Sequence, residues 1–286
     1  MSTTLINFAN KNFRQQQYLS ALLGKIHGKF DNVICYAPKH LDSHFVQKNI
    51  DIFSLKRGFG YWLWKPYLIL KTLNAVRYGD WVVYSDSGSF FINSVKNILN
   101  EIECFNQDVV GFELPLIERQ WTKRELFISM ECDDSFFKDS NQIHASIQFV
   151  KKSKFSLEFY KEYLNIAQSV INLTDECDYS VDQDPFFIEH RHDQSIYSLL
   201  YKKNNLITFK DPTQYGDDPF SYAACTIEKV PPDIVHQLPN GRYFRYHSFA
   251  QKYGTVIYQY RRAPPLRSYI SVLRHNFISK YSFNDW

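Results

Sequence analysis

The run RGFGYWLWKP at residues 57–66 has the composition of a site that binds a phosphate and a ring. It combines two glycines and several large aromatic residues with Arg57 and Lys65. Glycines let a ligand approach the backbone, aromatic faces stack on a base or a sugar, and the two cations can pair with phosphates. This mixture favours a nucleotide sugar. The alternative is a turn that leads into a buried aromatic helix, and the glycine spacing is neither that of a Walker loop nor that of a dinucleotide-binding loop.

A second candidate is Asp86, in the sequence WVVYSDSG at residues 81–88. The hydrophobic run predicts a buried strand, and ligands of open α/β sheets bind outside the carboxyl ends of such strands. A carboxylate there can bind a divalent cation that bridges a diphosphate, or accept hydrogen bonds from a ribose. The alternative is that Asp86 only caps the turn.

The run EHRHDQS at residues 189–195 crowds polar side chains at a predicted helix start. Asp193 alone would be typical of a helix N-cap. The addition of His190, His192 and Gln194 within the same few residues is unusual for capping and favours a functional site.

Two further runs carry weaker signals. ERQWTKREL at residues 118–126 places Arg119, Lys123 and Arg124 around Trp121, a pattern equally typical of a solvated helix start. RYHSFAQK at residues 245–252 contains His247 and Lys252. Each of these two residues, taken singly, is typical of a protein surface.

Alternating strands and helices are expected to position these residues. This alternation predicts an α/β fold that opens with a βαβ unit. Residues 205–250, rich in Asp, Pro, Tyr and Gly, are expected to form a long loop region that closes over a site. We expect strands at 4–9, 32–37, 81–88, 108–114 and 145–152, and helices at 15–23, from Pro66 to about 76, at 156–170 and at 192–202.

Composition narrows the class of protein. The 286 residues are 44% apolar and 22% charged, which excludes disordered, collagen-like and coiled-coil chains. Aromatic residues are 17% of the chain, which suits a ring-rich core, a sugar site or an interface. The net charge of +3 argues against a general nucleic-acid binder.

We expect a domain at residues 1–250 and a basic amphipathic C-terminal tail at 251–286. In this tail, Leu266, Ile270, Leu273 and Phe277 form one helical stripe.

Targeting and cysteine patterns predict a cytoplasmic protein. Neither a signal sequence nor a run of 18 apolar residues is found. The five cysteines include no CxxC pair, so we expect reduced thiols and no zinc site. They are Cys35, Cys104, Cys132, Cys177 and Cys225.

The order of the motifs resembles a family of bacterial glycosyltransferase-like proteins found with surface-polysaccharide genes. The motifs RGFGYWLWKP, YSDSG, QWTKREL, HASIQFVKKS and HRHDQSIYSLL carry this resemblance, which covers residues 4–202. More distantly, the chain is similar to GT-A glycosyltransferases of the glycogenin and lipopolysaccharide galactosyltransferase type. The resemblance implies a GT-A-like (Rossmann-like) α/β fold: a mixed, mostly parallel sheet flanked by helices, with a C-terminal helical tail.

The resemblance also implies roles for residues. Asp86 matches the first acid of a DxD motif, but Gly88 replaces the second. Two alternatives therefore stay open: Mn²⁺ or Mg²⁺ bound at Asp86 and His247, or no metal, with the diphosphate neutralised directly by Lys65, Arg57 or Lys252. His236 is a rival of His247. The other implied site residues are Asp193, Gln194 and His192 for catalysis; Phe8, Ala9, Arg57, Gly60, Tyr61, Lys65, Asp86, Ser87, Ala145, Ser146 and Lys252 for the donor; and Trp121, Lys123, Arg124 and His190 for the acceptor.

The implied function is transfer of a sugar from a nucleotide-sugar donor, expected to be UDP-linked. The acceptor would be a glycan or lipid-linked molecule of bacterial capsule or lipopolysaccharide assembly, reached at the inner membrane through the basic tail. Asp193 would act as a base in an inverting reaction, whereas Gln194 or Asp193 would support a cationic sugar in a retaining one. The alternatives are a non-catalytic glycan-binding or scaffolding protein and, third, a phosphosugar or nucleotidyl transferase.

Overall fold

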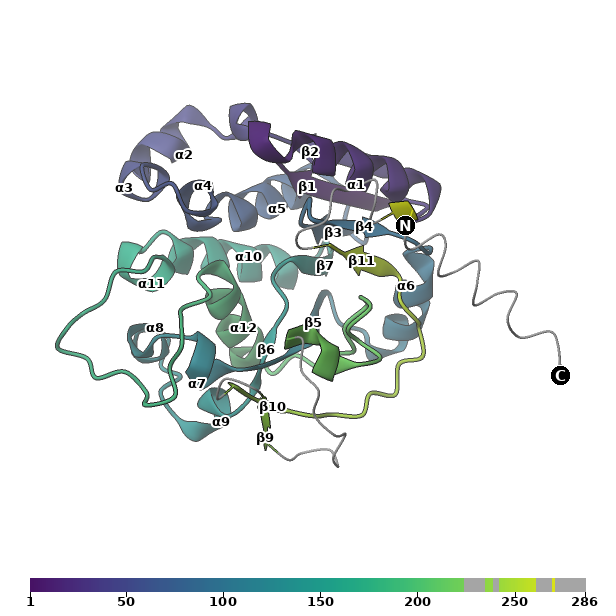
Figure 1. Ribbon diagram of the computed structural model, residues 1–286. Helices are drawn as coiled ribbons and strands as arrows, with labels where there is room; N and C mark the ends of the chain where they lie inside the picture. The colour runs from purple at the N-terminus through teal and green to yellow at the C-terminus, as the bar shows by residue number, and fades with distance from the viewer. Residues whose placement is uncertain (224–234, 239–241, 261–268, 271–286) are drawn as a thin grey trace, which may run out of the picture.

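The computed structural model describes residues 1–223, 235–238, 242–260 and 269–270 (Figure 1). Its centre is a seven-stranded sheet in the order β2-β1-β3-β7-β5-β6, with β8 paired to β5. Parallel pairing joins β2, β1 and β3, and β7 runs antiparallel to both β3 and β5, so five strands point in one direction. The strands are β1 Thr3–Phe8, β2 Asn32–Tyr36, β3 Trp81–Ser85, β5 Val109–Ile117, β6 Asn141–Ile143, β7 Ile147–Lys151 and β8 Thr208–Phe209.

Helices cover both faces of this sheet (Figure 1), as expected for a mixed, mostly parallel sheet in an α/β fold. The α-helices are α1 Arg14–Ile26, α2 Ser43–Lys48, α3 Ile50–Phe53, α4 Gly58–Tyr61, α5 Trp64–Ala75, α6 Lys96–Ile102, α7 Glu118–Trp121, α8 Arg124–Ser129, α9 Ser135–Lys138, α10 Lys154–Ala167, α11 Val170–Leu173 and α12 Asp193–Lys203. Short 3-10 helices lie at Lys11–Phe13, Pro38–His40, Glu103–Phe105 and Pro219–Ala223.

The central strand β3 shows why the sheet is buried on both sides. All five of its residues are buried, and they alternate between two hydrophobic clusters. Val82 and Tyr84 face the cluster formed with α5, α10 and α12, whereas Trp81 and Val83 face the cluster formed with α6. Successive side chains of a strand point to opposite faces, so a continuous apolar run is what a doubly covered strand requires.

The expected elements in the first 203 residues are confirmed, whereas the expected loop region is partly wrong. Short strands occur there: β8 pairs with β5 of the central sheet, and β9 Val235–Leu238 pairs with β10 Arg242–Arg245 in a separate two-stranded sheet. The side chain of His236, the rival metal ligand, lies outside the part that the structure describes.

Residues 251–260, assigned to the tail by sequence, pack on the domain. Strand β11 Ile257–Gln259 pairs antiparallel with β4 Ser89–Phe91, and Tyr253 and Val256 are buried in the same cluster as Trp81. The expected helix at 264–278 lies outside the described residues except for 269–270. The division at residue 250 therefore stays a prediction.

Two further observations concern the described residues. Four cysteines there are free thiols, namely Cys35, Cys104, Cys132 and Cys177. None of the helices there is long and apolar enough to cross a membrane.

Candidate active site

Two adjoining cavities open where the strands β1 and β3 end. The strand-end cavity, about 300 Å³, is lined by the segments around Lys65, Asp86, Ser146 and Asp193. The β1 cavity, about 450 Å³, is lined by 8–13, 56–59 and 86–88 and by Trp62 and Trp64. Both cavities share Trp62, Asp86 and Gly88, so together they form one cleft at the edge that the sequence predicted. Three cations and two carboxylates line the strand-end cavity: Arg57, Lys65, Arg191, Asp86 and Asp193.

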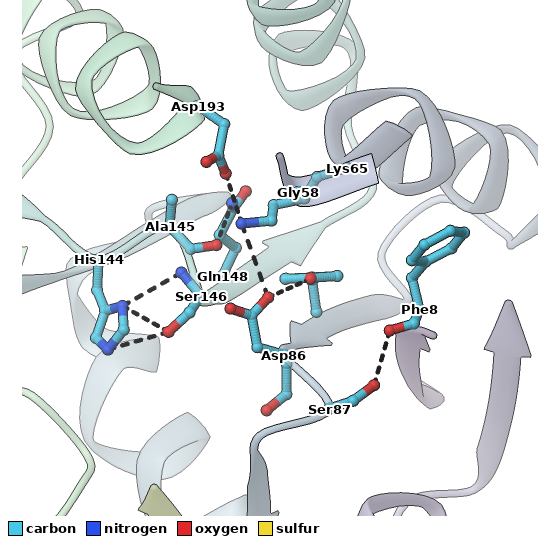
Figure 2. A network of polar contacts seen from close by, with 12 residues as sticks. Phe8, Gly58, Lys65, Asp86, Ser87, His144, Ala145, Ser146, Gln148 and Asp193 are labelled. Atoms are coloured by element: carbon cyan, nitrogen blue, oxygen red, sulfur yellow. Dashed lines mark hydrogen bonds and ion pairs between the residues drawn. The ribbon is translucent and has the colours of Figure 1, made fainter. Parts of the chain in front are cut away.

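A buried ammonium group joins two carboxylates at the centre of the cleft (Figure 2). The Lys65 Nζ lies 2.5 Å from Oδ2 of Asp193 and 3.7 Å from Oδ1 of Asp86. The side chains of Lys65 and Asp193 are only 3% and 7% exposed, whereas that of Asp86 is 36% exposed. Asp86 is therefore the carboxylate of this trio that meets solvent and a ligand.

The environment shifts the pKa values of this buried pair upward. Burial raises the pKa of Asp193 to about 6, against the attraction of the Lys65 ammonium. For Lys65, burial disfavours the charge, but the carboxylates of Asp193 and Asp86 outweigh it and raise the pKa. Lys65 is thus cationic at neutral pH, and Asp193 is ionised above about pH 6.

Hydrogen bonds fix the turn that carries Asp86. The hydroxyl of Tyr84 donates to Oδ1 of Asp86, and burial raises the pKa of Tyr84 well above its ordinary value, so the phenol keeps its proton. Ser87 Oγ donates to the carbonyl of Phe8 over 2.7 Å, which ties this turn to the end of β1. Ser89 Oγ donates to the carbonyl of Asp86 over 2.7 Å. The carboxylate therefore has a set direction before any ligand binds.

Residues 144–146, just before β7, form another wall of the strand-end cavity (Figure 2). The carbonyl of Ala145 accepts a hydrogen bond from Gln148, and Ser146 Oγ lies 2.9 Å from His144 Nδ1. The backbone N–H of Asp86 donates to the carbonyl of Ser146 over 2.9 Å. These contacts join the predicted donor residue Ser146 directly to Asp86, and Ala145 precedes it on the same wall.

The start of α12 supplies the remaining wall. Gln194 Nε2 donates to Oε1 of the buried Gln142 over 2.7 Å, which orients the Gln194 amide. His192 Nδ1 donates to the carbonyl of Leu173 over 3.0 Å, while its buried Nε2 has no hydrogen-bond partner. Burial lowers the pKa of His192 to about 4, so the ring is neutral, and its Nε2 is an acceptor that is buried rather than exposed to the cavity.

Residues 58–62 form a left-handed turn that separates the two cavities. Their φ angles are all between +50° and +80°, and only Gly58 and Gly60 adopt such angles without strain. Strain of this kind persists where surrounding contacts hold it, and it gathers at functional sites. Trp62, at the end of the turn, lines both cavities and stacks on His192 at 5.6 Å.

Asp175 holds this turn in place. Its carboxylate accepts hydrogen bonds from Tyr61 Oη over 2.7 Å and from Arg57 Nη1 over 3.0 Å. His192 Nε2 lies 3.7 Å from the other Asp175 oxygen. One carboxylate from the segment between α11 and α12 therefore links the strained turn to the residue that precedes Asp193.

The β1 cavity has aromatic walls. Phe8 stacks on Trp64 with ring centroids 3.9 Å apart, and Phe59 and Trp62 line the same space. Ala9 lies beside them at the end of β1. Such flat apolar walls suit a base or another planar ring, and the carboxylate of Asp86 at one end can accept hydrogen bonds from hydroxyl groups attached to it.

The expected divalent-metal ligands do not come together. His247 lies in another cavity, where its Nδ1 is 2.9 Å from Glu113, and Gly88 supplies no carboxylate. Over the described residues, no three His, Cys, Asp or Glu side chains form a cluster that could hold a metal ion. Asp86, already bonded to Tyr84 and near Lys65, does not make a metal site from protein ligands, so no step below uses a metal.

The expected acceptor residues lie inside the protein rather than on the cavity walls. Trp121 is 1% exposed beneath the guanidinium of Arg191, and Lys123 is 1% exposed with its Nζ donating to the carbonyl of Thr174. His190 Nε2 donates to the carbonyl of Asn172. These residues therefore anchor the segment that precedes α12.

Two other expected residues also lie away from the cleft walls. Arg124 bonds to Asp133 and to the carbonyl of Asp182. Lys252 is exposed near Glu101 and lines neither cavity. The role of both in ligand binding has no support from their placement.

Several wall residues were not singled out by the sequence, among them His144, Arg191 and Gln259. His144 is the first residue of the HASIQF motif, Arg191 lies within the HRHDQ motif, and Gln259 belongs to β11. Arg191 could have been found from its neighbours in the motif. Gln259 could not, because only the pairing of β11 with β4 brings it to the cavity.

Comparison with known proteins finds distant structural similarity only. No protein-family model matches the chain, and no curated protein matches its sequence. Among solved structures, it is similar to mouse xyloside xylosyltransferase 1, with 10% identity over 92% of this chain and 100% of that chain and a TM-score of 0.46. An active-site mutant of LgtC gives 11% identity over 95% of each chain and a TM-score of 0.47. Both TM-scores are below 0.5, so neither similarity assigns this chain to a fold family or an activity.

A third similar structure is a glycosyltransferase involved in the glycosylation of the major capsid of PBCV-1. Its identity is 12% over 96% of this chain and 100% of that chain, with a TM-score of 0.41. With identities of 10–12% and TM-scores of 0.41–0.47, the chemistry of this chain has to be argued from its own cleft.

Proposed function

We propose that this protein transfers a sugar from a nucleotide-sugar donor to a glycan or lipid-linked acceptor. The observation that supports this most strongly is the joining of an aromatic cavity to a charged one at Asp86. A nucleotide sugar needs both parts, because its base is flat and apolar while its diphosphate and sugar are polar. The base would lie in the β1 cavity against Trp62, and the sugar would lie between Ser146 and Asp193.

Charge in the strand-end cavity would favour departure of a nucleoside diphosphate. Arg57 is 45% exposed and Arg191 37% exposed, and both line this cavity, so their guanidinium groups can pair with phosphate oxygens. The buried Lys65 holds Asp86 and Asp193 in fixed positions below the sugar. Preorganised positive charge aimed at a leaving group is the main catalytic contribution in such a reaction.

Hydrogen-bond acceptors would position the sugar and its acceptor. Asp193, ionised above about pH 6, accepts hydrogen bonds from sugar hydroxyls, and the neutral His192 ring packs nearby against Trp62. Gln194, fixed by Gln142, lies beside them. This arrangement serves either stereochemical course.

The finer assignment is a UDP-linked donor and a role in bacterial capsule or lipopolysaccharide assembly, with the protein held at the inner membrane by its basic tail. It is supported by the order of sequence motifs and by the charge of residues 261–280. Replacing Arg261, Arg262, Arg267 and Arg274 with Glu is expected to abolish pelleting with anionic vesicles. Unchanged pelleting would remove the tail from this proposal.

The competing function is non-catalytic glycan binding, favoured by Gly88 in place of a second acid. A thermal-shift panel of nucleotide sugars separates the two, because a ligand that binds only the native state raises the melting temperature. The transferase proposal expects one class of nucleotide sugar to stabilise the wild-type protein and to lose this effect in Asp86→Ala. Stabilisation by free glycans and by no nucleotide sugar would support the alternative.

A further inference from the structure

Helix α1 presents an apolar and basic face that covers nothing in the described structure. Tyr18 is 71% exposed, Leu22 44% and Ile26 47%. They recur every fourth residue, and with 3.6 residues per turn this spacing places them along one side of the helix. Phe13, just before the helix, is 53% exposed. Figure 1 shows α1 on the outside of the molecule.

Positive charge accompanies this apolar face. Lys11, Arg14, Lys25 and Lys29 are all exposed, and residues 1–30 contain no Asp or Glu. At 100° per residue, Arg14 and Lys25 fall within about 40° of Tyr18 on the helix, so charges border the apolar stripe. The next acid along the chain, Asp31, accepts hydrogen bonds from Thr3 and so is already engaged.

One described residue of the C-terminal part of the chain, Tyr269, contacts the end of α1. Tyr269 Oη lies 3.2 Å from His27 Nε2, at the C-terminal end of α1, and its ring packs against Phe90. Arg261, Arg262 and Arg267 precede Tyr269 in the chain, and Arg274 and Lys280 follow it. Tyr269 thus contacts the C-terminal end of α1, and the sequence on both sides of it is basic.

We propose that the exposed face of α1 is a docking surface for an anionic lipid membrane. An interfacial helix combines exposed aromatic and aliphatic side chains with Lys and Arg, which meet acyl chains and anionic headgroups respectively. A protein partner would need acids to complement four cations, whereas an anionic bilayer supplies them at any position. We therefore commit to the membrane and treat a protein partner as an outcome of the test.

The position of this face relates it to the cleft. Asn12 and Phe13, at the start of α1, also line the β1 cavity. A membrane bound along α1 would consequently lie beside the mouth of the cleft, where a lipid-linked acceptor enters. This last step rests on the proposed transferase function, but the docking itself does not.

The test is cosedimentation of the full-length protein with vesicles. We expect pelleting with vesicles of phosphatidylglycerol and phosphatidylcholine, little with phosphatidylcholine alone, and a decline as salt screens the charges. A triple variant, called the apolar variant, combines Tyr18→Ser, Leu22→Gln and Ile26→Gln. We expect it to bind these vesicles at least about tenfold more weakly than the wild-type protein. The double variant Lys11→Gln with Arg14→Gln is expected to bind about 30-fold more weakly.

A matched control removes equally exposed apolar side chains on other elements. Phe136 is 67% exposed, Ile128 48% and Ile207 49%, close to the exposures of the α1 residues. The triple variant Phe136→Ser, Ile128→Gln and Ile207→Gln is expected to pellet like the wild-type protein. An equal loss in this control would overturn the proposal, because it would show that any exposed apolar residue contributes.

Two further measurements keep the inference distinct from the proposed function. The rate of hydrolysis of a soluble nucleotide sugar should be the same in the apolar variant and the wild-type protein. If the wild-type protein hydrolyses no nucleotide sugar, the transferase proposal is weakened but the docking proposal is not.

Light scattering in solution tests whether a second copy of the chain, rather than a membrane, covers the α1 face. A dimer of the wild-type protein that becomes a monomer in the apolar variant would assign the face to a second copy and overturn the membrane proposal.

Discussion

The ammonium of Lys65 lies 2.5 Å from the carboxylate of Asp193, although the two residues are 128 positions apart in the chain. Lys65 belongs to the first turn of α5 and Asp193 is the first residue of α12, so the pair joins the two helices at the bottom of the cleft. The hydroxyl of Tyr163 donates to the carbonyl of Asp193 over 2.9 Å and fixes its backbone as well. A buried pair of this kind sets the position of the site more than it stabilises the fold.

Removal of one partner is expected to be costly. Lys65→Met leaves the Asp193 carboxylate buried without its cation, and such losses cost about 3–5 kcal/mol of unfolding free energy. Urea unfolding measures the change. The double variant Lys65→Met with Asp193→Leu removes both charges and should be clearly more stable than Lys65→Met alone. A double variant as unstable as the sum of the two single variants would show that the pair is not coupled.

Activity is expected to fall at acid pH through Asp193. Its pKa of about 6 means that the carboxylate gains a proton below that pH and loses its attraction to Lys65. The value of kcat/KM for donor turnover should therefore fall about tenfold per pH unit below pH 6. His192→Gln is a control, because the His192 pKa of about 4 keeps that ring neutral over this range. An acid limb that is unchanged in Asp193→Asn would contradict the assignment.

The core strands and helices were predictable because their apolar runs are long and end at clear signals. The stretch around Asp86 is the best example: five buried residues of β3 are followed directly by the predicted carboxylate. Asp193 at the start of α12 was predictable for a similar reason. In both places local sequence and tertiary burial favour the same structure.

Burial of charged residues was not predictable in the same way. The run around Trp121 and Lys123 has the composition of a solvated helix, yet both side chains are 1% exposed because the segment before α12 folds over them. The role of Asp175 was also missed, since its partners Arg57 and Tyr61 lie more than 110 residues away. Long-range contacts of this kind leave no local pattern.

The left-handed turn gives a prediction with an internal control. Gly60 has a φ of +80°, and an added Cβ would lie 2.8 Å from Cδ1 of Phe53, so Gly60→Ala adds both strain and a clash. Gly79 has a φ of +85° with nothing within 4 Å, so Gly79→Ala adds strain alone. We expect about 1 kcal/mol of destabilisation for Gly79→Ala and more for Gly60→Ala.

The affinity for a nucleoside diphosphate is a second property in which Gly60→Ala and Gly79→Ala should differ. Gly60→Ala should weaken binding of a nucleoside diphosphate, because the turn carries Trp62 between the two cavities, and Gly79→Ala should not. Isothermal titration measures both affinities. Equal affinities in the two variants would show that the turn has no part in the ligand site.

Metal dependence can be tested by restoring the missing acid. We expect chelation by EDTA to change the affinity of the wild-type protein for UDP by less than about twofold, because Asp86 is the single acid of the motif. An added Cβ at Gly88 would meet no closer atom than the Tyr260 carbonyl at 3.9 Å, so Gly88→Asp has room to fold. This variant should gain Mn²⁺ binding visible by electron paramagnetic resonance. Strong Mn²⁺ binding by the wild-type protein would contradict the placement of ligands given above.

Release of nucleoside diphosphate from nucleotide sugars is the most direct test of the central claim, that the cleft around Asp86, Lys65 and Asp193 cleaves a nucleotide sugar. The measurement compares the wild-type protein with Asp86→Ala and Asp193→Asn over a panel of donors, with and without Mn²⁺. We predict slow release from one class of donor by the wild-type protein, and at least about 100-fold slower release by both variants. No release from any donor by a folded wild-type protein, or equal release by the variants, would contradict the account.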